Sequence, residues 1–210
     1  MRNTAPENRL SSEFYRRASV EVARDLLGKI IVTVRHSQGS RKGPFTQVTS
    51  GRIVETEAYG ENDPASHSAK GETPRNSVMF GEPGIAYVYF IYGMYEMLNF
   101  VTDPKGKAGA VLIRALEPIT GIEIMSERRG LSKELELTNG PGKLCQALGV
   151  QLSDNGQALQ GPALFVYDDA YPICSIGSSG RIGISAAKEK LWRFYIRGNP
   201  YVSGPKQMRV

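Results

Sequence analysis

YVYFIYGMYEMLNF, residues 87–100, decides the fold of this chain, because two strand-like runs flank a Tyr-Gly-Met-Tyr step. Gly93 and Met94 suit the centre of a tight turn in which glycine comes first. The stretch therefore predicts a β-hairpin with Tyr92 at its tip. Aromatic side chains on a sheet usually belong to the core, and this is the ordinary interpretation of Tyr87 and Phe90.

The core interpretation is weaker for Tyr92, since a hairpin tip is difficult to bury. An exposed ring on a basic protein suits insertion between stacked bases, as the wedges of minor-groove binders do. The chain carries a formal charge of +5 and has a pI near 9.2. That charge permits a polyanionic partner but does not require one, because scattered lysines and arginines usually form a solvated surface.

Further strand-like runs lie on both sides of the hairpin, and three short amphipathic stretches end at glycines. One of these helices is expected to start with Ser19 as N-cap and to stop at Gly28. A polar turn is expected at 37–44 and a long polar loop at 61–82, where loops of such length are often functional. Strands are predicted at 29–34, 49–60, 83–102 (the hairpin), 108–118, 161–168, 181–186 and 192–203, and further helices at 120–130 and 140–149.

Helix and strand do not alternate regularly, and this mixture favours an α+β fold. We expect one compact domain over residues 1–210, with a mostly antiparallel curved sheet, short helices and a protruding hairpin. Hydrophobic residues make up 40% of the 210 residues and charged residues 22%, as in ordinary globular proteins.

The cysteines Cys145 and Cys174 lack metal or redox spacing, so both are expected to be buried thiols in a reducing compartment. The N-terminus has no apolar segment of a secretory signal, and no run reaches the roughly 18 apolar residues of a membrane span. A cytoplasmic protein without a membrane partner is expected.

The segment RIVETEAY, residues 52–59, carries two candidate carboxylates. On a strand, Glu55, Glu57 and Tyr59 share one face. Taken alone, these residues are best interpreted as a solvated sheet face. The functional alternative is a carboxylate beside an aromatic wall, which could activate a water molecule.

His67 stands in the long polar loop, where a histidine usually faces solvent. No second histidine or cysteine stands at ligand spacing, and the zinc deaminase pattern is missing. No metal site is therefore expected. In NGPGKLCQALG, residues 139–149, Lys143 falls in the first turn of a helix whose N–H groups could receive a phosphate. A capped helix with Pro141 at its first position is an equally good interpretation.

Six strings occur in an order that resembles one known family. They are RIVETEAY, the ASHS and TPRN loop, YVYFIYGMY, LIRALEP, GPGKLCQAL and RFYIRGNPYVS, which together span residues 52–203. The chain resembles the alkyladenine (3-methyladenine, methylpurine) DNA glycosylases, and it lacks the N-terminal extension of animal members, as bacterial members do. The resemblance implies excision of damaged purines from double-stranded DNA, in base excision repair.

The resemblance also assigns chemistry. Glu57 matches the general base that deprotonates a water for attack on the sugar C1′, and Arg114 matches the arginine that helps to hold this water and a nearby phosphate. Such an enzyme is monofunctional and requires no cofactor. Implied substrates are 3-methyladenine, 7-methylguanine, hypoxanthine and ethenoadenine.

Other positions match residues that bind DNA in the family. Tyr59 and Tyr89 match the two rings that stack on the flipped base, with His67 beside them. Asn99 matches the asparagine that discriminates against the amino group of normal guanine. Tyr92 matches the intercalating tyrosine, and Met94 lies beside it in the groove.

Three alternatives remain open from the residues. The first is a catalytically inactive lesion-binding module, against which Glu57 and Arg114 speak. The second is a hydrolase of small nucleosides, and the third is a structural or scaffold protein. A monomer is expected, because a protein that wraps one lesion needs no symmetry.

Overall fold

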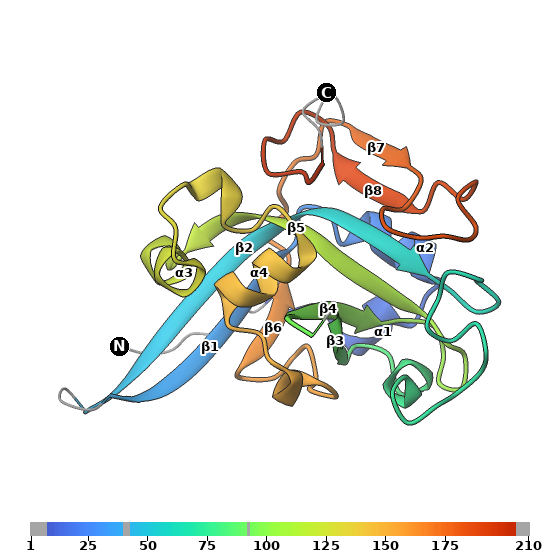
Figure 1. Ribbon diagram of the computed structural model, residues 1–210, viewed down its shortest axis with the longest axis horizontal. Coiled ribbons are helices and arrows are strands. Elements are labelled where there is room, and N and C mark those ends of the chain that lie inside the picture. The colour runs from blue at the N-terminus through green and yellow to red at the C-terminus, as the bar shows by residue number, and fades with distance from the viewer. Residues whose placement is uncertain (1–7, 40–42, 92, 205–210) are drawn as a thin grey trace.

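Antiparallel strand pairing organises the computed structural model, which describes residues 8–39, 43–91 and 93–204 (Figure 1). Within these ranges eight strands form one sheet in the order β3-β4-β5-β2-β1-β6, while β8 pairs with both β2 and β7. The strands are β1 (Ile30–Gly39), β2 (Gly43–Tyr59), β3 (Ala86–Ile91), β4 (Tyr95–Val101), β5 (Ala110–Thr120), β6 (Leu164–Tyr167), β7 (Ile176–Ser179) and β8 (Arg193–Ile196).

Short helices connect and cover these strands. They are α1 (Ser12–Tyr15), α2 (Ser19–Asp25), α3 (Ile122–Arg129) and α4 (Pro141–Leu148), with 3-10 turns η1 (Ser77–Phe80), η2 (Glu134–Glu136) and η3 (Leu152–Asp154). The curled sheet with few short helices confirms the α+β prediction. No helix in the described part of the chain has the length and apolar character needed to cross a membrane.

Strand alternation separates a core face from a second face. Leu98 and Phe100 of β4 are fully buried in the main hydrophobic cluster. Their neighbours Met97 and Asn99 line a pocket instead. On β2, Thr56 lies on the core side, because its hydroxyl donates to the Ala23 carbonyl of α2 at 2.8 Å. The core thus lies between the sheet and the helices, and the other face remains for function.

The hairpin of residues 83–102 forms as β3 and β4, but its turn differs from the prediction. Ile91 pairs with Tyr95, and the Met94 N–H donates to the Ile91 carbonyl at 3.2 Å. Gly93, with φ of 69°, is therefore the third residue of this turn and not the first of its central pair. Phe90 is 40% exposed, so its assignment to the core was wrong.

Two further boundaries need correction. Ser19 was expected to be the N-cap of α2, but it is the first residue of this helix. Its N–H is capped from a distant loop, where the Asp103 carboxylate accepts it at 3.1 Å. The predicted strand at 181–186 does not form; β7 lies at Ile176–Ser179. Cys145 is buried as expected, but Cys174 is exposed.

The remaining predicted elements form with shifted ends. β1 and β2 continue into the predicted polar turn and make a long hairpin that runs to the lower left in Figure 1. Strand β8 is shorter than the predicted 192–203 segment, and the long loop at 61–82 contains only η1 as a regular element. The helices expected at 120–130 and 140–149 are α3 and α4.

Candidate active site

Strand register brings the candidate residues together in one row across the sheet. Tyr87 of β3 pairs with Asn99 of β4, Asn99 pairs with Leu112 of β5, and Leu112 pairs with Glu57 of β2. Glu57 also pairs with Arg193 of β8. Directly opposed residues of an antiparallel sheet project on the same side, so residues far apart in the chain face one site.

A cavity of about 290 Å³ opens on this face. Five residues expected at the site line it, namely Tyr59, His67, Tyr89, Asn99 and Arg114. Its other lining residues are Ala65, Ser66, Met79, Tyr87, Ile91, Met97, Ala110, Leu112, Pro141, Ile182, Gly183 and Ile184. The mostly apolar and aromatic wall with a few converging polar groups is typical of a small-molecule or base-binding pocket.

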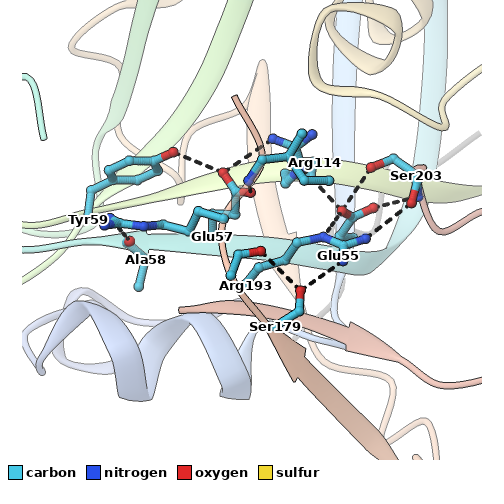
Figure 2. A network of polar contacts seen from close by, with 11 residues as sticks. Glu55, Glu57, Ala58, Tyr59, Arg114, Ser179, Arg193 and Ser203 are labelled. Atoms are coloured by element: carbon cyan, nitrogen blue, oxygen red, sulfur yellow. Dashed lines mark hydrogen bonds and ion pairs between the residues drawn. The ribbon is translucent and has the colours of Figure 1, made fainter. Parts of the chain in front are cut away.

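Glu57 lies one side chain behind the pocket wall and is fully buried. Its Oε2 accepts a hydrogen bond from the Tyr59 hydroxyl at 2.9 Å, and its Oε1 accepts one from the Ile182 N–H at 2.6 Å. Arg114 Nη1 lies 3.2 Å from Oε2 as an ion pair. Figure 2 shows Glu57 between Tyr59 and Arg114. The carboxylate is thus fixed at both oxygens.

Arg114 reaches Glu57 from a bulge in β5. Ala115 pairs with Glu55 and Ile113 with Thr56, so Arg114 is the extra residue of β5 at this point. A bulge next to a site re-aims a side chain. Burial disfavours the charged guanidinium, but Glu57 and Glu55 outweigh this cost, and the pKa of Arg114 is raised above its ordinary value.

Glu55 does not lie on a solvated sheet face, as the sequence suggested, but at the centre of a buried network. It accepts hydrogen bonds from Arg193 Nε at 2.6 Å and from the Ser203 N–H and hydroxyl at 2.6 and 2.8 Å. Arg114 Nε adds a contact at 3.2 Å. The carboxylate therefore connects β2, β5 and β8 with the segment around Ser203 (Figure 2).

The aromatic wall is assembled from two strands and the long loop. The His67 ring packs edge-on against Tyr89, with centroids 4.4 Å apart, and its Nδ1 lies 3.0 Å from the Tyr87 hydroxyl. Tyr87 is buried, as a core residue would be, yet it lines the pocket and bonds to His67. His67 is exposed to solvent, as expected of a loop histidine, and its ring also packs on the aromatic wall.

Desolvation favours the uncharged form of each of these polar side chains. Desolvation raises the pKa of Tyr87 to about 12. Desolvation also raises the pKa of Tyr89 and that of Tyr59, to which the nearby Glu57 carboxylate contributes. Desolvation and the positive charge of Arg75 lower the pKa of His67. At neutral pH the pocket therefore offers hydroxyl and neutral imidazole groups to a ligand.

Asn99 lines the pocket, and its side-chain amide is hydrogen-bonded to the backbone. Its Nδ2 donates to the Tyr87 carbonyl at 3.2 Å and to the Met97 carbonyl at 3.4 Å, and the residue is 4% exposed. Both hydrogen bonds use the amide nitrogen, so the side chain cannot turn without breaking them.

The residues expected to contact DNA lie apart from the pocket or outside the described residues. Met94 is 61% exposed at the hairpin turn, and Tyr92 lies outside the described residues. Lys143 stands in the first turn of α4, where its Nζ donates to Asn139 Oδ1 at 2.7 Å. Pro141, two residues earlier, lines the pocket.

Sequence reasoning missed three residues of the site. Ile182 donates its N–H to Glu57, Arg181 packs its guanidinium 4.6 Å from the Tyr59 ring centroid, and Asp63 is the ion-pair partner of Arg181. The RIGISA string, residues 181–186, was interpreted as a strand, and only its position before the matched RFYIRG string could have drawn attention to it. Among the described residues no group of three or more His, Cys, Asp or Glu side chains could hold a metal ion.

Comparison with known proteins agrees with this geometry. The model of the methylpurine-DNA glycosylase family matches residues 13–200. The chain belongs to this family. A relative from Chlorobaculum tepidum is 49% identical over 93% of this chain and 90% of its own length. Relatives from Prosthecochloris aestuarii (47%, 93% and 91%) and Carboxydothermus hydrogenoformans (46%, 92% and 98%) are similar. All three carry the provisional name 3-methyladenine DNA glycosylase.

Family membership makes this glycosylase a DNA-binding hydrolase that cleaves N-glycosidic bonds of alkylated purines in DNA repair. Base excision repair begins with this reaction. The alternatives of a nucleoside hydrolase and a scaffold protein are thereby set aside.

Proposed function

We propose that this glycosylase flips a damaged purine nucleotide out of duplex DNA and hydrolyses its N-glycosidic bond by attack of water on C1′. The observation that carries the proposal is the buried Glu57 carboxylate, which is fixed by Tyr59, Ile182 and Arg114 directly behind an aromatic pocket. A duplex hides the base and C1′, so the nucleotide must leave the stack first.

The pocket recovers part of the cost of flipping. Extrusion costs roughly a few kcal/mol, and least for a damaged, poorly paired base. Stacking on an aromatic side chain returns about 1–3 kcal/mol per base. Tyr59 and Tyr89 supply the rings, with His67 beside the base or sugar. A cationic alkylated purine gains further from the electron-rich ring faces.

Glu57 acts as general base in this proposal. Its ion pair with Arg114, at 3.2 Å, is longer than the roughly 2.7–2.9 Å of a strong charge-assisted hydrogen bond. A water molecule that enters with the substrate can hydrogen-bond to Glu57 in place of part of the Arg114 contact. Hydrogen bonds of catalytic groups often shorten only once the substrate is bound. The negative carboxylate also stabilises the positive charge that develops on the sugar, while Arg114 holds the water and a phosphate.

Specificity and DNA contacts are assigned to the remaining residues. Asn99, whose amide is hydrogen-bonded to two backbone carbonyls, disfavours the exocyclic amino group of normal guanine. 7-Methylguanine carries the same amino group but is still released, because its cationic ring is a better leaving group. Tyr92 fills the gap left by the flipped nucleotide, with Met94 beside it in the groove, and Lys143 contacts a phosphate. The substrates are 3-methyladenine, 7-methylguanine, hypoxanthine and ethenoadenine in double-stranded DNA, and the enzyme works as a cytoplasmic monomer.

The test measures base release from a duplex with one hypoxanthine and from methylated DNA. The wild type is expected to release free base from them, and Glu57→Gln is expected to lose about 10²–10⁴-fold in rate, the usual contribution of a general base. Lesion binding should persist in Glu57→Gln, because the pocket wall is unchanged. Glu13→Gln, at an exposed glutamate of α1, is the matched control.

The other outcomes separate the candidates. Release from methylated DNA alone narrows the substrate range, while full turnover by Glu57→Gln removes the general-base role. Tight binding without release by the wild type identifies a lesion-binding module.

A further inference from the structure

Arg181 occupies an unusual position beside the site, because it is buried and contacts three separate segments. Its Nη1 donates to the Ala58 carbonyl of β2 at 2.9 Å and to the Asp63 carboxylate, and its Nη2 donates to Asp63 Oδ1 at 2.9 Å. The guanidinium also lies over the rings of Tyr59, at 4.6 Å, and Trp192, at 5.3 Å. Both side chains of the Arg181–Asp63 pair are fully buried.

Asp63 holds the start of the long loop where it lines the pocket. Its Oδ1 accepts the Ala65 N–H at 3.2 Å, and its backbone carbonyl accepts the Ser66 N–H at 2.8 Å. Ala65 and Ser66 line the cavity. Burial opposes the charged form of Asp63, but the hydrogen bonds from Arg181 and Ala65 outweigh it, and its pKa is lowered. Asp63 is therefore an ionised anchor of the turn that leads to His67.

On the other side, the residue that follows Arg181 touches the proposed general base. The Ile182 N–H lies 2.6 Å from Glu57 Oε1, and residues 182–184 line the pocket. This stretch belongs to no strand, so no sheet ladder holds it in place. The start of this stretch is held by the hydrogen bonds that the Arg181 side chain donates to the Asp63 carboxylate and to the Ala58 carbonyl.

We propose that Arg181, through Asp63, is a positioning residue that sets the Ile182 N–H on Glu57 and holds the Tyr59 ring as a pocket wall. This inference deepens the proposed function and rests on it for its catalytic consequence. The arginine fork bonds Asp63 with two nitrogens and Ala58 with one of them. A lysine keeps the charge but presents a point charge instead of a planar fork. Arg181→Lys therefore removes the two-nitrogen contact with Asp63 but retains the positive charge.

The chain offers a matched control. Arg35 makes a two-pronged pair with Asp154, at 3.0 and 2.6 Å, and donates its Nε to the Gly149 carbonyl at 3.0 Å. None of these three residues lines the pocket. Arg35→Lys therefore removes the same kind of interaction elsewhere in the fold. Thermal unfolding of the two variants compares their general loss of stability.

Two readouts test the proposal. The first is the exchange rate of the Ile182 amide hydrogen, measured by NMR relative to amides of β5, and it needs no activity. The second is the single-turnover rate of base release at saturating enzyme, with methylated duplex. In Arg181→Lys we expect Ile182 exchange at least about tenfold faster, since a local opening replaces a fixed hydrogen bond. Release should be at least about tenfold slower, with the lesion Kd changed less than the rate.

Arg35→Lys should change both readouts by less than about threefold. The proposal is overturned if Ile182 exchange in Arg181→Lys stays at the wild-type rate, or if release falls no further than in Arg35→Lys. A wild type without base release refutes the proposed function alone, because the exchange readout still decides whether Arg181 positions Ile182. If Arg181→Lys does not fold, Asp63→Asn replaces it, with the same changes expected at smaller size.

Discussion

At the scale of single residues, His67 shows how the pocket controls charge. Its ring lies against Tyr89 and next to the Tyr87 hydroxyl, and both desolvation and Arg75 disfavour the imidazolium. A neutral imidazole can accept as well as donate a hydrogen bond. It also avoids repulsion of a cationic alkylated purine. His67 therefore fits a pocket for damaged bases better when it is neutral.

We predict that His67 titrates below the ordinary histidine value of about 6.5. Between the folded and the unfolded pKa the unfolded chain binds the proton and the folded chain excludes it. The free energy of unfolding therefore falls as the pH is lowered through this window. NMR titration of the ring measures the pKa, and denaturant unfolding at several pH values measures the slope. His67→Gln should flatten that slope, and a titration midpoint at or above the ordinary value would contradict the prediction.

At the scale of elements, Glu55 joins three strands. Its carboxylate meets Arg193 of β8, Arg114 of β5 and the backbone at Ser203, far from solvent. The same Arg114 bridges to Glu57, so the network that holds the strands together also orients the site. Removal of one member leaves buried charges without their partner.

We predict that Glu55→Gln lowers the free energy of unfolding by about 3–5 kcal/mol, the usual cost of breaking a buried ion pair. The control is Asp25→Asn, which breaks the exposed Arg17–Asp25 pair of 2.7 Å and should cost less than about 1 kcal/mol. Urea unfolding followed by circular dichroism measures both values. Equal losses in the two variants would show that Glu55 is not a structural centre.

At the scale of the whole molecule, the positive charge divides into an internal and an external part. Arg114, Arg181 and Arg193 are buried and paired with carboxylates, so they neutralise the interior. These three ion pairs cancel, so the formal net charge of +5 belongs to other residues of the chain, and the cations that can meet DNA are the exposed ones. Attraction to the phosphate backbone depends on these exposed cations and is weakened by salt.

We predict that log Kobs for undamaged duplex falls linearly with log salt, with a slope of about −0.9 per phosphate contact. Lys143→Gln should reduce the magnitude of this slope by about 1, because one phosphate contact is lost. Lys29→Gln removes the same charge from a side chain that is paired with Asp168 at 2.7 Å, and it should change the slope less. Fluorescence anisotropy between low and physiological salt measures the slopes. An unchanged slope for Lys143→Gln would mean that this lysine does not touch phosphate.

Sequence periodicity correctly predicted the features of the fold that are set by residues close together in the chain. The hairpin at residues 83–102 formed because alternation and a turn glycine act locally, and five of the expected site residues line one pocket. Three predictions failed for a common reason. The cap of α2 comes from Asp103, the environment of Glu55 from Arg193 and Ser203, and the place of Ile182 from Glu57. Each depends on a partner more than 80 positions away in the chain.

The sequence by itself determined the mixed fold, the hairpin and the family, and its resemblance to that family singled out Glu57 as the residue for which we propose the general-base role. Only the tertiary structure decided that Glu55 lies in a buried network while Glu57 lies directly behind the pocket wall, and that Arg181 pairs with Asp63 next to it. Local periodicity fixes which face a side chain takes. Burial and ion pairing depend on which distant segments cover that face, and strand register and the β5 bulge set this arrangement.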